Sequence, residues 1–136
     1  MLSAELHQTH LPVAARLTKR VVAVILAQVH KATGMDGELS IVFLPEKEMR
    51  QLNKMYRQKD KVTDVLSFEL PLGDILICYP QAKRQAAERG HTVKQEVVDL
   101  IIHGALHALG YDHEKPKDAK IMLPLQQKIY DAVAPR

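Results

Sequence analysis

The segment from Val93 to Leu109 is apolar on most of its sides, and this feature constrains the fold more than any other. Thr92 precedes the segment and Gln95 stands three positions later, which is the pattern of a capping box at a helix N-terminus. Gly110 follows and can take the left-handed conformation that ends a helix. A helix that is apolar on most sides must be covered by other elements. We therefore expect this helix in the middle of the fold.

The other elements are predicted from apolar periodicity and from turn residues. Four further helices are expected, from Pro12 to a cap at Gly34, over Glu46–Arg57, from Pro80 to about Arg89, and over roughly Asp118–Val133, the last interrupted or bent by Pro124. Strands are expected over Met1–His10 (irregular or at an edge), Leu39–Phe43, Val65–Leu70 and Ile75–Tyr79, the last two as a hairpin. This order predicts an α+β fold in which about five helices cover a small mixed sheet of about four strands.

Length and composition limit the class of protein. With 136 residues, 46% of them apolar and 26% charged, the chain fits a single globular domain over residues 1–136. No stretch reaches the roughly eighteen apolar residues of a membrane span, and no signal peptide is recognisable. The single cysteine, Cys78, cannot form an internal disulfide, which agrees with a reducing compartment. We expect a cytoplasmic protein with no membrane partner.

The charges permit a polyanionic partner without requiring one, because the net charge is only +3. Five cations fall within twelve residues beside one acid, Asp60: Arg50, Lys54, Arg57, Lys59 and Lys61. Alone, this pattern indicates a solvated helix face followed by a polar loop. The chain has two phenylalanines, four tyrosines and no tryptophan, so its composition gives no sign of base stacking.

Three histidines surround the end of the central helix. His103 and His107 are four residues apart, so their side chains lie on one helix face, one turn apart. Gly110 lets the chain turn, and His113 can then approach the same point from beyond the helix end. Three imidazoles with a fourth position open to water form a catalytic type of zinc site. We expect this zinc site at the C-terminal end of the central helix.

The histidine spacing matches that of the metzincin zinc peptidases, H-E-x-x-H-x-x-G-x-x-H. Those enzymes use the glutamate as general base, and this chain has Gly104 at that position, which cannot transfer a proton. Peptidase activity by that route is therefore excluded. Asp112, beside the third histidine, either accepts a ring proton from a ligand or caps the turn.

The run from His103 to His113 resembles the H-G-x-L-H-L-x-G-Y-D-H signature of the YbeY family of bacterial endoribonucleases. Other segments resemble that family in the same order, so that the resemblance covers about Leu39 to His113: Leu52-Asn53 with Tyr56-Arg57, Asp60-Lys61, Thr63 to Phe68, and Leu72 to Cys78.

This resemblance implies a zinc-dependent, single-strand-specific endoribonuclease that acts in 16S rRNA 3′-end maturation and ribosome quality control. It implies one Zn²⁺ per chain, held by His103, His107 and His113, and catalytic roles for Arg57 and His103. The implied partners are single-stranded RNA, the 16S rRNA precursor, and the small ribosomal subunit or its assembly factors. These roles suit the residue types, since zinc polarises phosphoryl oxygens and an arginine fork binds phosphate.

Two segments depart from the family pattern. Glu69–Leu72 replaces a longer acidic loop, so the effect on substrate binding or specificity stays open. Leu123-Pro124-Leu125-Gln126 lacks the acidic pattern of the family, so an interaction made by the last helix also stays open. The general base also stays open among Glu114, Asp64 and the RNA 2′-hydroxyl. Two other functions compete: a zinc hydrolase of another substrate class, and a non-catalytic ribosome-associated RNA-binding factor with a structural zinc.

Overall fold

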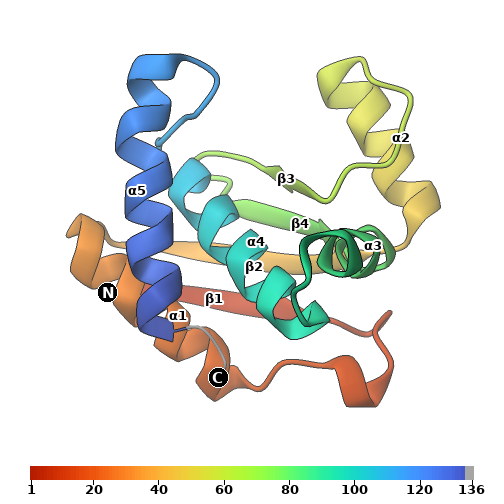
Figure 1. The fold of residues 1–136 in the computed structure, drawn as a ribbon, viewed down its shortest axis with the longest axis horizontal. Helices are drawn as coiled ribbons and strands as arrows, with labels where there is room; N and C mark the ends of the chain where they lie inside the picture. The colour runs from red at the N-terminus through yellow and green to blue at the C-terminus, as the bar shows by residue number, and fades with distance from the viewer. Residues whose placement is uncertain (134–136) are drawn as a thin grey trace.

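A four-stranded mixed sheet with helices on both faces forms the structure, a computed structural model that describes residues 1–133 (Figure 1). The strand order is β1-β2-β4-β3; β1, β2 and β4 run parallel, and β3 pairs antiparallel with β4. The elements are β1 (Leu2–His7), the short 3₁₀ helix η1 (Val13–Ala15), α1 (Lys19–Thr33), β2 (Gly37–Leu44), α2 (Glu46–Arg57), β3 (Val65–Ser67), β4 (Asp74–Cys78), α3 (Tyr79–Arg89), α4 (Val93–Ala108) and α5 (Pro116–Val133). The α+β prediction, the hairpin and the edge position of the first strand are confirmed. The end of the predicted domain, residues 134–136, lies outside the described residues.

The two faces of the sheet carry cores of different size because side chains alternate along a strand. On one face, Ile41, Ile75 and Ile77 are fully buried in the main core, under α4 and α1. On the other face, Leu66 and Cys78 pack with Met49 of α2 in a small separate cluster. The face with the larger core thus packs against the central helix α4, and the face with the smaller core packs against α2.

The central helix α4 forms as predicted. The Thr92 hydroxyl accepts a hydrogen bond from Gln95 N (3.1 Å), and Thr92 N donates to Gln95 Oε1 (2.9 Å), which completes the capping box. The helix packs against β2, β3 and β4 and against α1, α3 and α5, so it is covered on most sides (Figure 1). Gly110 follows its end with a φ of 100°, a left-handed value that glycine adopts without strain.

Gly104 lets α4 approach the sheet more closely than any other residue could. A Cβ at this position would lie 2.5 Å from Ile75 Cγ2 and 3.1 Å from Ser67 Oγ. Ile75 is fully buried and its Cγ2 is fixed at the branch of the side chain, so it cannot swing aside as a flexible chain end would. The glycine therefore sets the distance between helix and sheet.

The helix predicted from Pro12 begins later than expected. Residues 13–15 form only η1, and α1 starts at Lys19, where the Thr18 side chain accepts a hydrogen bond from Val21 N (3.1 Å). The reason is a tertiary contact, because the Gln8 side chain bonds both the N–H and the C=O of Leu17, each at 2.8 Å. These bonds hold the segment extended until the threonine cap.

Other boundaries also differ from the predicted ones; for example, β1 ends at His7 and β2 extends over Gly37–Leu44. β3 ends at Ser67 instead of Leu70, because Leu70 N donates to the carbonyl of Ala108 at the end of α4 (3.0 Å) and the chain leaves the sheet. The last helix begins at Pro116 and runs through Pro124 to Val133 without the predicted interruption. Within residues 1–133 no helix is long and apolar enough to cross a membrane.

Helix α2 has the predicted bounds. Its apolar residues Tyr56 and Met55 keep 54% and 66% of their surface exposed, whereas Asn53 is buried. Asn53 Nδ2 donates to the carbonyl of Lys61 (2.9 Å) and so ties the following loop to the helix. The polar Asn53 thus occupies a buried position on α2, because its side chain holds the following loop. The aromatic Tyr56 lies at the surface instead.

We predict that Gly104→Ala destabilises the protein by about 1–3 kcal/mol, although alanine favours helices, because the added methyl overlaps Ile75. Thermal or urea unfolding measures the change. In a double-mutant cycle, the cost of Gly104→Ala should fall in an Ile75→Ala background, where Cγ2 is absent. Equal costs in both backgrounds would contradict the proposed contact.

Candidate metal centre

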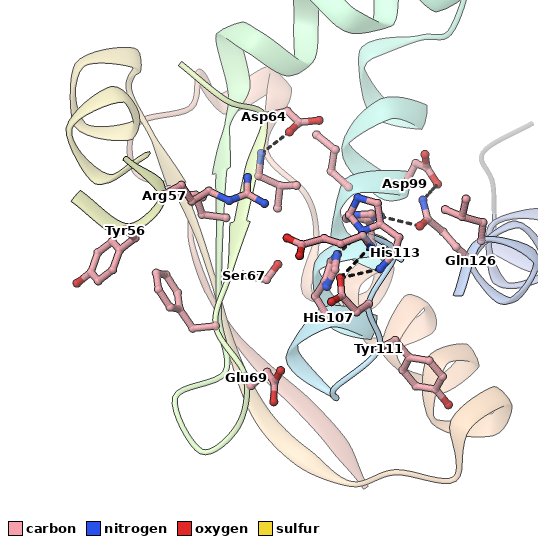
Figure 2. Close-up of a pocket in the computed structure, with 18 of the residues that line it drawn as sticks. Tyr56, Arg57, Asp64, Ser67, Glu69, Asp99, His107, Tyr111, His113 and Gln126 are labelled. Carbon is pink, nitrogen blue, oxygen red and sulfur yellow. Dashed lines mark hydrogen bonds between the residues drawn. The ribbon is translucent and has the colours of Figure 1, made fainter. Parts of the chain in front are cut away.

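A pocket of about 580 Å³ lies beside the C-terminal half of α4 (Figure 2). Strand β3 contributes Ser67, α2 contributes Arg57, and α5 contributes Gln126. His103 and His107 enter from α4, and the loop after α4 brings in the third histidine. The pocket thus joins segments that are far apart in the sequence.

The three predicted histidines meet in this pocket. The ring centroids of His103, His107 and His113 lie 4.7–4.9 Å apart. One ligand nitrogen of each ring lies within 4.8 Å of the others, so the three residues could hold one metal ion. His107 Nε2 and His113 Nδ1 are 2.9 Å apart and share a hydrogen bond. Nitrogen ligands at this spacing suit zinc, and cysteine does not contribute, since Cys78 is buried elsewhere.

Burial favours the neutral form of the His103 and His107 rings, which is the form that binds metal. Burial lowers the pKa of His103, and burial together with the neighbouring histidines lowers the pKa of His107 to about 4. Both imidazoles are therefore neutral near pH 7. A donor set that keeps its lone pairs available fits a divalent cation.

A chain of two hydrogen bonds, through Asp99 and Gln126, fixes the orientation of His103. The Asp99 carboxylate can only accept, so the Gln126 amide nitrogen faces it (3.0 Å) and the amide oxygen faces His103 Nδ1 (2.7 Å). That oxygen accepts, so Nδ1 carries the ring proton and Nε2 keeps its lone pair. Helix α5 thereby selects the tautomer of His103 that can bind metal through Nε2.

Asp112 caps the turn through backbone hydrogen bonds rather than through a hydrogen bond to a histidine ring. Its Oδ1 accepts hydrogen bonds from His113 N (2.7 Å) and Glu114 N (3.2 Å). These two bonds, the first being the larger cause, hold the pKa of Asp112 below its ordinary value. Of the two roles expected from the sequence, the structure supports the turn cap, which places the backbone of His113.

Arg57 extends from the end of α2 toward the histidines (Figure 2). Other arginines are engaged with carboxylates: Arg50 with Asp60 (2.8 Å), Arg84 with Glu46 (2.6 Å) and Arg89 with buried Glu96 (2.8 Å). Within residues 1–133, the Arg57 guanidinium has no carboxylate partner. An exposed, uncommitted guanidinium beside a candidate metal site is suited to an anionic substrate.

The pocket carboxylates differ in how far they are engaged. Asp64 accepts from Val65 N (2.8 Å) through Oδ1 and from Gln85 Nε2 (2.9 Å) through Oδ2, so it is a structural residue here. Glu114 also lines the pocket, is exposed, and has no side-chain partner in the described part of the chain. Of these two candidates, Glu114 is the one free to accept a proton.

Gly104 excludes a metzincin-type base for a second, structural reason. The position faces β3 and β4, where even a methyl group would overlap Ile75. A glutamate there would have to displace the sheet before it could approach the histidines. The ligand spacing of the peptidases is therefore present on a helix that has no room for their base.

The fold and this site together define a class of protein: an α+β domain that presents three histidines at the end of a sheet-packed helix, beside an uncommitted arginine. The family model described as endoribonuclease YbeY matches residues 3–134. The chain belongs to the YbeY family.

Curated relatives and a solved structure agree with this assignment. The chain is 49% identical to endoribonuclease YbeY of Sulfurihydrogenibium sp. over 104 residues, 69% of this chain and 68% of the relative. It is 37% identical to endoribonuclease YbeY of Persephonella marina over 129 residues, 86% of this chain and 84% of the relative. The solution structure of TM1509 from Thermotoga maritima matches with a TM-score of 0.70 at 30% identity, covering 98% of this chain and 89% of that one.

Sequence reasoning missed Asp99 and Gln126. Asp99 stands four residues before His103, on the same helix face as the two histidines, and this spacing could have identified it. Gln126 carries no such signal, because its contact with His103 spans 23 residues and depends on how α5 packs against α4.

We predict that Gln126→Leu weakens metal binding about 10- to 100-fold, because His103 loses the acceptor that fixes its tautomer. Competition against a chromophoric chelator measures the dissociation constant. Gln127→Leu is the matched control, since within residues 1–133 the Gln127 side chain bonds only the exposed Asp131 (2.8 Å). Equal affinities in the two variants would show that the Gln126 contact does not support the site.

Proposed function

We propose that this protein is a zinc-dependent endoribonuclease that cleaves single-stranded RNA. One observation carries the proposal: His103, His107 and His113 share a pocket with Arg57, whose guanidinium has no carboxylate partner within residues 1–133. Membership of the YbeY family, whose relatives are named endoribonucleases, supports RNA as the substrate. Histidine ligands without cysteine support zinc in a catalytic site.

Each residue has a defined task in this proposal. A zinc ion on the three imidazoles would supply Lewis acidity toward a phosphoryl oxygen or water. Arg57 binds two phosphate oxygens through its planar fork and stabilises the charge that builds on them in the transition state. His103 donates its Nδ1 proton to Gln126, which leaves the Nε2 lone pair available to a metal. Glu114, an exposed carboxylate that lines the pocket, would accept a proton.

The biological role proposed for this activity is 16S rRNA 3′-end maturation and ribosome quality control in the cytoplasm. The 16S rRNA precursor would be the substrate, and the small ribosomal subunit or its assembly factors would be the partners. This part of the proposal rests on the family resemblance. A processing enzyme must cleave unpaired RNA at a defined position. A small pocket does not determine that position, and docking on a larger particle would determine it.

We expect purified, zinc-loaded protein to cleave a labelled single-stranded RNA, and metal-free protein to be inactive until zinc is restored. Arg57→Ala should lower the turnover about 100- to 1000-fold, as expected for removing a donor to transition-state charge. Arg50→Ala is the matched control, because Arg50 lies on the same helix, pairs with Asp60 and does not line the pocket. Casein should stay intact; its cleavage would favour a hydrolase of another substrate class.

We expect His113→Ala to abolish RNA cleavage while the protein stays folded and still binds RNA. His113 lies in the loop after α4, outside the hydrophobic core, so its removal leaves the packing intact. Circular dichroism and a filter-binding assay separate the outcomes. Unfolding of the variant would instead favour a structural zinc in a non-catalytic RNA-binding factor.

A further inference from the structure

Aromatic side chains gather at the pocket although the chain has few of them. Of its two phenylalanines and four tyrosines, three residues line the pocket: Tyr56, Phe68 and Tyr111. Tyr56 and Phe68 lie edge to face, with ring centroids 5.0 Å apart and an interplanar angle of 75°. Tyr56 keeps 54% of its surface exposed. Composition gave no sign of base stacking, and the structure places an aromatic pair beside Arg57.

The exposure of Tyr56 is not required by the packing of α2. Met49 and Leu52 attach this helix to the small core, against which Phe68 also packs, and Asn53 takes the next buried turn. Tyr56 contacts Phe68 with one edge-to-face interaction and leaves ring surface open to the solvent. An exposed aromatic surface in a pocket with a free guanidinium is more typical of a binding site than of a contact that only stabilises the fold.

We propose that Tyr56 and Phe68 form a nucleobase-binding subsite that stacks one unpaired base of the RNA strand. This inference rests on the proposed function and extends it. Tyr56 and Arg57 are neighbours on the last turn of α2, so their side chains leave the helix about 100° apart. Base and phosphate also point in different directions from a ribose. The tyrosine therefore receives a base while the arginine holds a phosphate of the same strand.

The subsite accounts for single-strand selectivity with residues of this chain. A base in a duplex is stacked on both sides and cannot offer a face to a side chain, whereas an unpaired base can splay out onto an aromatic ring. Stacking is tolerant of sequence, because every base has a π face. The subsite selects unpaired RNA and leaves the choice of sequence to other contacts.

Three variants test the subsite in the zinc-loaded protein. Tyr56→Leu should raise the KM for single-stranded RNA about five- to hundredfold with little change in kcat, because it removes stacking from substrate binding. Tyr56→Phe should behave as wild type. Met55→Ala is the matched control, since Met55 is the neighbouring exposed apolar residue on α2 and does not line the pocket. A fall in kcat at unchanged KM would overturn the proposal.

A fluorescent base distinguishes failure of the subsite from failure of the proposed function. Single-stranded RNA containing 2-aminopurine should lose fluorescence on binding metal-free wild type and Tyr56→Phe, and keep it with Tyr56→Leu. Quenching without RNA cleavage by the zinc-loaded protein would retain the subsite and reject the nuclease. Cleavage with equal quenching by wild type and Tyr56→Leu would retain the nuclease and overturn the subsite.

Discussion

The close packing of α4 on the sheet at Gly104 is the constraint on which the site depends. His103 precedes this glycine by one residue and His107 follows it by three, so their directions differ from that of Gly104 by about 100° and 60° on the same side of the helix. Pressing Gly104 against Ile75 therefore turns both imidazoles toward the pocket edge of the helix. Any side chain at the glycine would lift the helix from β4 and move the two histidines together.

Hydrogen bonds also orient the histidines, and the donor or acceptor character of each group determines the direction of each bond. A carboxylate accepts only, and an amide offers one donor group and one acceptor group, so Asp99 determines the orientation of Gln126 and Gln126 determines the tautomer of His103. Asp112 acts similarly on the backbone of His113. The donor set is arranged before an ion binds, because every one of these partners belongs to the protein.

Local pattern was enough to predict the elements, but not the contacts between them. The capping box, the burial of α4 and the histidine spacing are properties of neighbouring residues, and the structure confirms that the histidines meet. The start of α1 was wrong because Gln8 binds Leu17 across the intervening chain. The roles of Gln126 and Phe68 were invisible for the same reason, since each depends on two segments that only tertiary packing brings together.

The same ligand spacing can serve different reactions, and the pocket decides between them. In the metzincin pattern the base comes from the residue after the first ligand, and here the sheet occupies that direction. The pocket beside the histidines includes a free guanidinium, an exposed carboxylate on Glu114 and an aromatic pair, contributed by α2, the segment after β3 and the loop after α4. A peptide offers the guanidinium no phosphate and the aromatic pair no base, whereas an RNA strand offers both. The neighbours of the three histidines, rather than the histidines themselves, therefore distinguish an RNA strand from a peptide.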